Sequence, residues 1–178
     1  MPEQSTEYRP LPPDDLSRNL ALGRLGEGKL PHIGLVGDTY TITVSEEDTN
    51  GRYSVIDMHV PPGGGPGLHR HNYDETFIVL EGEIEVTFRG TKTTARAGDT
   101  ATIPSNAPHK FHNAASEPGR LICICSPAGI EKFFLEVGVP VASRTTPPPA
   151  LDKDQMAKFI KKALALAPKY QTEILIES

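Results

Sequence analysis

The chain has 178 residues, and its 23 acidic side chains outnumber its 18 lysines and arginines, giving a formal net charge of −5. This length supports one domain with a substantial core. The negative charge argues against a nucleic-acid partner, which requires a surplus of clustered Lys and Arg. No window approaches the roughly 18 apolar residues of a membrane span, and the first residues lack a signal-peptide pattern. The sequence therefore predicts a cytoplasmic protein without a membrane partner.

The first 34 residues differ from the rest in being rich in Pro, Gly and charged side chains. They predict an N-terminal arm, residues 1–34, with one short helix near residues 14–22. We expect residues 35–126 to form the main β domain and residues 127–178 to form a C-terminal helical extension.

From Asp38 onward the hydrophobic pattern has a period of two, and short segments of this kind alternate with Gly, Pro, Asn and Asp turns. The pattern predicts strands at 38–44, 53–60, 68–71, 75–80, 83–88, 92–97, 100–103, 109–113 and 119–126. Many short antiparallel strands without an intervening helix indicate an all-β barrel or sandwich.

Two helices are predicted after the strands. In "SPAGIEKFFLEVG", Ser126 is a candidate N-cap and Pro127 suits the first helical position. After a Pro-rich linker, Asp152 precedes Gln155 by three residues, which is the spacing of a capping box. This second helix carries one apolar stripe, made of Met156, Phe159, Ile160, Ala163, Leu164 and Ala167. Its opposite face carries Lys158, Lys161 and Lys162, which we interpret as solvated.

The cysteines of the chain, Cys123 and Cys125, are two residues apart in a predicted strand. Alternation places both side chains on one face, where the stiff strand does not favour a bridge. We interpret them as reduced, buried, small hydrophobic residues.

Three residues with metal-binding side chains fall on one face of a predicted strand. His69, His71 and Glu75 occupy positions i, i+2 and i+6, so a regular strand points them the same way. Imidazole and carboxylate donors suit divalent Fe, Mn, Ni, Co, Cu or Zn. His109, on a later strand, is a candidate fourth ligand. His32, His59 and His112 lie outside this pattern.

The same residues give the chain a resemblance to the cupins. The first cupin motif is matched by Gly63, His69, His71, Glu75 and Gly82. The second is matched by Gly98, Pro104, His109 and Asn113, with Asn106 where glycine is usual, a position that Asn tolerates. The C-terminal region looks similar to that of single-domain cupins related to the quercetin dioxygenases.

This resemblance implies an all-β cupin jelly-roll barrel, the double-stranded β-helix, with a short N-terminal arm and two C-terminal helices. It also implies one divalent transition metal held by His69, His71, Glu75 and His109. The alternative is a metal-free barrel that keeps these residues for packing or ligand contact.

Four protein ligands leave coordination positions open for a small-molecule substrate and dioxygen. The favoured hypothesis is a metal-dependent dioxygenase acting on an enolic or phenolic molecule, with Glu75 as general base. An apolar wall for the substrate is predicted at positions that could equally be ordinary core: Phe77, Val79, Ile103 and Phe111. The alternatives are a non-redox isomerase, decarboxylase or cyclase, and a small-molecule-binding module without turnover. We expect a homodimer, with the arm exchanged between two copies.

Overall fold

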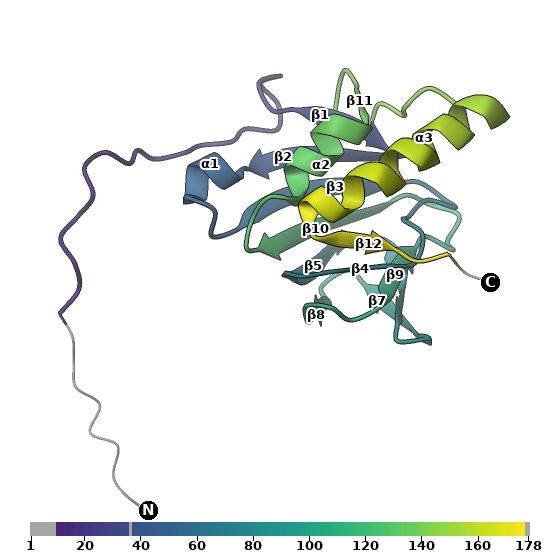
Figure 1. The fold of residues 1–178 in the computed structure, drawn as a ribbon, viewed down its shortest axis with the longest axis horizontal. Coiled ribbons are helices and arrows are strands. Elements are labelled where there is room, and N and C mark those ends of the chain that lie inside the picture. Colours follow the sequence, from purple (N-terminus) through teal and green to yellow (C-terminus); the bar gives the residue numbers. More distant parts are fainter. Residues whose placement is uncertain (1–9, 36, 177–178) are drawn as a thin grey trace, which may run out of the picture.

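The computed structural model describes residues 10–35 and 37–176 (Figure 1). Within these residues, antiparallel strands form two sheets. The larger sheet has the order β11 (Val139–Pro140), β1 (His32–Leu35), β2 (Asp38–Val44), β3 (Ser54–Val60), β10 (Gly119–Ser126), β5 (Asp74–Glu81) and β8 (Thr100–Ile103). The smaller has the order β12 (Thr172–Ile174), β4 (His69–His71), β9 (His109–His112), β6 (Glu83–Phe88) and β7 (Thr91–Arg96). This architecture confirms the expected all-β jelly roll.

The core lies between the two sheets, and strand alternation selects its residues. In β10 every second residue is buried, which turns Leu121, Cys123 and Cys125 inward. Their partners Met58 and Ile56 on β3 are also buried. The expectation that both cysteines are free and buried is confirmed.

Helix α2 (Ile130–Val137) packs against strands β1 and β3 of the larger sheet and so extends the core. The structure also has α1 (Glu46–Thr49), α3 (Lys153–Leu166) and the short 3-10 helix η1 (Ala167–Tyr170). Phe134 of α2 packs edge-on against Tyr40 of the larger sheet, with ring centroids 5.1 Å apart. The predicted capping box of α3 is confirmed: the Gln155 amide donates to Asp152 over 2.8 Å. Among the described residues, no helix is both long enough and apolar enough to cross a membrane.

The predicted helix at residues 14–22 is wrong, because the structure has no helix there. Its leucines are exposed, Leu16 by 87% and Leu20 by 90%, and a short helix in water needs an apolar face to bury. The predicted start of the next helix is also wrong. Gly129, not Ser126, is the N-cap of α2, and the buried Glu131 carboxylate accepts the Gly129 amide over 2.9 Å.

Three strands lie in segments that the sequence assigned to other elements. β11 lies in the predicted helical extension and pairs with β1. β1 begins at His32, within the predicted arm, and pairs with β2. β12 lies in the predicted helical extension and pairs with β4, so that Thr172 is opposite His71 and Ile174 is opposite His69. The end of the chain therefore borders the strand that carries two candidate ligands.

The outer face of the larger sheet carries a buried carboxylate. Asp57 of β3 points away from the core, between the inward Ile56 and Met58, yet is 0% exposed. Arg120 lies 2.6 Å from its carboxylate, and Arg144 of the irregular segment after β11 lies 3.7 Å away. These ion pairs attach that segment to the sheet.

Candidate metal centre

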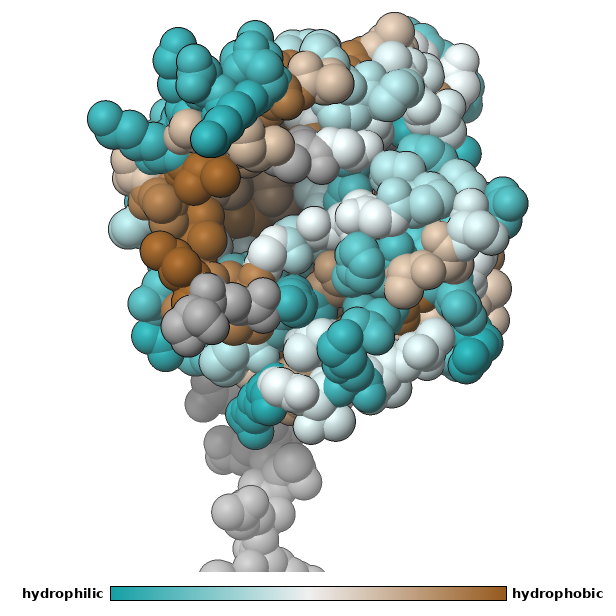
Figure 2. All heavy atoms as spheres, turned by 90° about the vertical axis from the view of Figure 1, so that its right-hand side faces the viewer, coloured by the Kyte–Doolittle hydropathy of each residue, from teal (hydrophilic) through white to brown (hydrophobic). Residues whose placement is uncertain are grey.

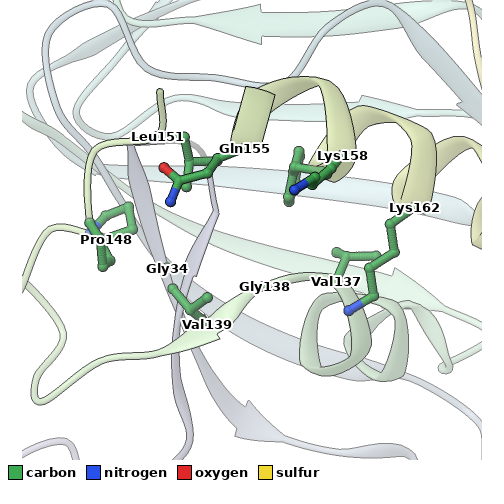
Figure 3. Close-up of a pocket in the computed structure, with 11 residues that line it drawn as sticks. Gly34, Val137, Gly138, Val139, Pro148, Leu151, Gln155, Lys158 and Lys162 are labelled. Atoms are coloured by element: carbon green, nitrogen blue, oxygen red, sulfur yellow. The ribbon is translucent and has the colours of Figure 1, made fainter. Parts of the chain in front are cut away.

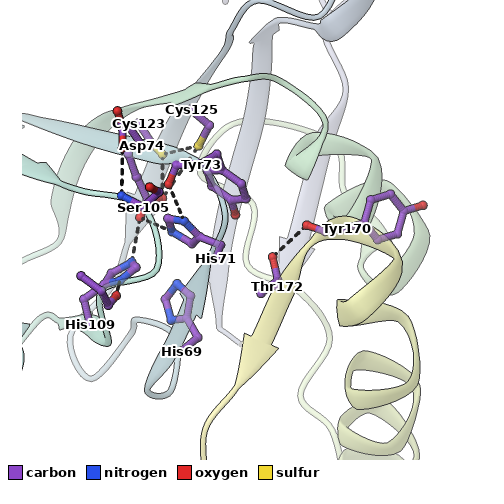
Figure 4. Close-up of polar contacts among 12 residues, drawn as sticks. His69, His71, Tyr73, Asp74, Ser105, His109, Cys123, Cys125, Tyr170 and Thr172 are labelled. Carbon is purple, nitrogen blue, oxygen red and sulfur yellow. Dashed lines mark hydrogen bonds and ion pairs between the residues drawn. The ribbon is translucent and has the colours of Figure 1, made fainter.

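The structure brings the four predicted ligands together from both sheets. His69 and His71 lie on β4, His109 is opposite His69 on β9, and Glu75 comes from β5 of the facing sheet. One ligand atom from each lies within 4.8 Å of the others. Figure 4 shows the three imidazole rings grouped around this point. His71, Glu75 and His109 are buried, whereas His69 is half-buried and forms the side nearest to solvent.

Each imidazole is oriented by a backbone carbonyl two residues away. Nδ1 of His69 lies 2.9 Å from the Gly67 oxygen. Nδ1 of His71 lies 2.9 Å from the Tyr73 oxygen, and Nδ1 of His109 lies 2.8 Å from the Ala107 oxygen. Because a carbonyl can only accept, Nδ1 carries the proton in each ring. A neutral ring then presents the lone pair of Nε2 to the centre.

The inward nitrogens face an acceptor rather than a donor. Nε2 of His109 is 2.9 Å from Glu75 Oε2, and Nε2 of His71 is 3.2 Å from the same oxygen. Neutral imidazole nitrogens and a carboxylate repel one another at these distances, so the arrangement requires a cation between them or on them. A metal ion can bind all of these nitrogen and oxygen atoms at once, whereas a proton bridges only one nitrogen and the carboxylate oxygen. The donor set therefore fits a transition-metal ion.

The pKa shifts of the metal-free site reflect the same arrangement. Burial opposes ionisation of Glu75. When a proton lies on Nε2 of His109 or His71, its hydrogen bond to Glu75 outweighs burial and holds the pKa of Glu75 below the usual value. Burial also opposes a charge on His109, yet the bond to Glu75 raises its pKa. Burial, followed by the charge of His109, lowers the pKa of His69 to about 4. His69 therefore stays neutral at pH 7, as a metal ligand must.

Sequence analysis missed the thiols that contact this site. Cys123 Sγ lies 3.1 Å from Glu75 Oε1, Cys125 Sγ lies 3.9 Å from it, and the two sulfurs are 3.5 Å apart. The Cys123 thiol donates to the carboxylate oxygen that faces away from the imidazoles. The pairing of β10 with β5 would have predicted this contact, because it places Cys125 directly opposite Glu75.

Tyr73 is a further neighbour that the sequence pattern did not single out. Its ring stacks on His71, with centroids 3.7 Å apart and an angle of 3° between the planes. It is two residues after His71, so the same alternation that selected the ligands could have identified it. The stacking and the Nδ1 bond together fix the plane of the His71 ring.

The predicted apolar wall lies in the packed core. Phe77, Val79, Ile103 and Phe111 are 2–3% exposed, and the rings of Phe77 and Phe111 meet edge to face at 5.2 Å. This burial fits the ordinary-core alternative that the pattern left open. A contact of these side chains with substrate stays a prediction.

The remaining motif residues have structural partners. The Asn113 side chain donates to the carbonyls of Val60 and Glu117, each over 2.9 Å, and so joins two backbone segments. Asn106 has the left-handed φ of 66° expected where glycine is usual. His32 contacts Thr41 on the outer face, and within the described residues neither His59 nor His112 joins a possible metal-ligand group.

The fold and the ligand cluster agree with a comparison of the sequence with known protein families. Residues 56–125 match the family described as Cupin domain. The two antiparallel sheets and the spacing of the two motifs agree with that match, so residues 56–125 form a cupin domain.

Individual relatives extend the similarity beyond the barrel. The chain is 27% identical over 152 residues to the quercetin 2,3-dioxygenase of Bacillus subtilis, covering 79% of this chain and 45% of that protein. This chain spans between 44% and 62% of the length of three relatives with similar sequences.

Solved structures agree on the fold. An RmlC-like cupin from Shewanella frigidimarina has a TM-score of 0.55 at 20% identity, covering 66% of this chain and 99% of that one. A structure described as a predicted oxalate decarboxylase from Thermotoga maritima has a TM-score of 0.53 at 22% identity, covering 60% and 98%. Barrels with different described activities thus share this fold, so the function must be argued from the site.

Proposed function

We propose that the barrel binds one divalent transition-metal ion through Nε2 of His69, His71 and His109 and the carboxylate of Glu75. The observation that carries this proposal is the meeting of imidazole lone pairs with Glu75 Oε2 at 2.9 and 3.2 Å. The backbone carbonyls hold each ring in the tautomer that a ligand needs. Outer contacts of this kind orient ligands in metal proteins.

We further propose that the protein is a dioxygenase acting on a small enolic or phenolic molecule. When bound, such an ion supplies Lewis acidity and open coordination positions. Similarity to a quercetin 2,3-dioxygenase over 79% of the chain supports this choice over the other cupin activities.

Within this proposal, the chain's own residues bind, orient and move one proton. The half-buried His69 is on the side nearest to solvent, so substrate approaches there. Glu75, 7% exposed, accepts the proton of the substrate hydroxyl at its carboxylate. The Cys123 thiol donates to Oε1, so Oε2, which faces the imidazoles, is the oxygen that would hold the metal ion.

The test combines metal analysis with oxygen consumption. The purified chain is loaded with Fe, Mn, Ni, Co, Cu or Zn, and oxygen uptake is followed with a panel of flavonols and diketones. We expect about one ion per chain and uptake with at least one pairing. His109→Gln removes a ligand and should abolish both, whereas His112→Gln changes an exposed histidine on the same strand and should change neither.

The other activities give different results in this experiment. Turnover that persists without oxygen in zinc-loaded protein would establish an isomerase, decarboxylase or cyclase. Bound metal without turnover of any compound would favour a binding module. Oxygen uptake in none of the pairings would contradict the dioxygenase.

A further inference from the structure

A groove lies on the side of the molecule remote from the ligand cluster, between the end of α2, β11 and the first turns of α3. Its floor is apolar, formed by Val137, Val139, Pro148, Leu151 and Phe159, and its cavity volume is about 230 Å³. Figure 3 shows Lys158 and Lys162 of α3 at its edge. Typical small-molecule pockets are larger, about 300–1,000 Å³, so the groove suits inserted side chains better than a separate ligand.

Apolar surface continues around this part of the chain. Leu151, Ile160 and Leu164 are 36%, 49% and 38% exposed, which leaves part of the predicted stripe of α3 uncovered. Figure 2, viewed from the side where α3 begins and the chain ends, shows hydrophobic residues around a hollow with hydrophilic residues at its edge. Contiguous apolar surface with a polar edge is typical of a protein interface.

The N-terminal arm has the complementary composition. Its leucines are uncovered: Leu11, Leu16 and Leu20 are between 86% and 90% exposed, and Leu22 is 65% exposed. Asp14 and Asp15 lie between the first two of these leucines. The arm therefore carries acidic groups beside apolar ones, as the groove carries lysines beside an apolar floor.

The direction of the arm indicates which groove its leucines can reach, that of the same chain or that of another copy. Arg18 donates to the Asp48 carbonyl over 2.9 Å, which holds the arm beside α1. In Figure 1, α1 and the arm lie at the opposite end of the molecule from the start of α3. From Arg18 toward the N-terminus the arm leads away from its own groove. The stretch from Arg18 back to residue 10 can reach about 27 Å when extended, enough to cross onto a neighbour.

We infer that two copies of this chain form a dimer in which Leu11 and Leu16 of each arm dock in the groove of the other copy. Asp14 and Asp15 then approach Lys158 and Lys162. The exchange is symmetric, because each copy offers one arm and one groove. This inference does not depend on the proposed metal or dioxygenase activity.

The experiment measures the molar mass of the full chain by light scattering during gel filtration, with the dissociation constant from analytical ultracentrifugation. Leu16→Glu changes the arm, and Leu151→Glu changes the groove. Asn19→Glu and Ala150→Glu are matched controls: each adds the same charge at an exposed neighbouring residue that is not one of the docking leucines or groove residues. Circular dichroism verifies that the folds are intact, since all these positions are exposed at the surface.

We expect the unchanged chain to have twice the mass of one copy. The arm variant and the groove variant should each weaken the dimer by about tenfold or more, because each replaces buried apolar contacts with a charge. The controls should stay within about twofold of the original. A monomeric original chain, or a dimer that either the arm or the groove variant leaves intact, would overturn the inference.

Discussion

Two buried carboxylates of this protein have opposite surroundings. Asp57, on the outer face of the larger sheet, is paired with the Arg120 guanidinium at 2.6 Å. Glu75, inside the barrel, faces Nε2 atoms of His71 and His109 whose rings already donate their Nδ1 protons to the backbone. The charge of Asp57 is balanced by the chain, whereas that of Glu75 is balanced only when a proton or another cation joins the site.

This difference separates a structural ion pair from a ligand set. A guanidinium is permanently charged and completes the pair when the chain folds. Neutral imidazoles add donors for a metal but no positive charge. The comparison predicts that changing Glu75 affects metal binding, and that changing Asp57 affects folding.

Glu75→Gln gives the largest expected effect. The neutral amide cannot balance a divalent ion, so affinity should fall by more than about hundredfold, beyond the effect of losing an outer contact to a ligand. Metal content measured by elemental analysis should fall from about one ion per chain to near zero. Equal metal content in the variant and the original chain would contradict the assignment of Glu75.

Asp57→Asn should reduce the free energy of unfolding by about 3 to 5 kcal/mol, because Arg120 and Arg144 lose their buried partner. Metal content should not change. Glu81→Gln is the matched control, since Glu81 also contacts Arg120, at 3.2 Å, but its side chain is 63% exposed. It should cost less than about 1 kcal/mol. Urea unfolding of both variants gives the comparison, and equal losses would show that burial of the pair is unimportant.

A third buried carboxylate, Asp38, extends the comparison. It contacts Tyr40 and Gly65 rather than a guanidinium or an imidazole. Burial raises its pKa to about 7, whereas the pKa of an aspartate in an unfolded chain is about 3.9. The folded chain therefore holds a proton that the unfolded chain releases. The stability from this group is complete below pH of about 4 and is lost as pH rises through about 7.

Asp38→Asn tests this titration. The amide keeps an oxygen for the Gly65 amide, which donates to Asp38 Oδ1 over 3.2 Å, but it has no charge to bury. Between pH 5 and pH 8 the original chain should lose on the order of 3 kcal/mol relative to the variant. Urea unfolding at several pH values measures the difference. Parallel pH profiles would contradict a protonated Asp38.

Cys123→Ala gives the smallest expected effect. It removes the thiol that donates to Glu75 Oε1 at 3.1 Å, so the carboxylate is less well oriented. Metal affinity should fall by about tenfold, at the low end for contacts that orient ligands. Cys125→Ala, whose sulfur is 3.9 Å from the same oxygen, should have a weaker effect. Competition with a chelator measures both, and an equal response would exclude an orienting role for Cys123.

Alternation along strands made most of the fold and the ligand cluster predictable. The predicted strands all appear, with ends that differ by at most one residue, because most combine β-branched or aromatic residues with a clear turn signal. The four candidate ligands converge because side chains at equal parity share a face.

The elements that sequence analysis missed depend on contacts between distant parts of the chain. β1, β11 and β12 have four, two and three residues, too few for a recognisable period, and they form by pairing with β2, β1 and β4. The apolar pattern at residues 14–22 resembled a helix, but within residues 10–35 and 37–176 no surface covers its leucines. The contact of Cys123 with Glu75 follows from the register of β10 with β5, which a single strand does not reveal.

The central claim is that the imidazoles of the barrel interior bind one metal ion together with Glu75. A crystal structure of the metal-loaded protein, with anomalous scattering recorded at the absorption edge of that metal, tests it most directly. The account predicts one peak about 2.1 Å from Nε2 of His69, His71 and His109. No peak among these nitrogens after loading, or His109 turned away from the other two, would contradict it.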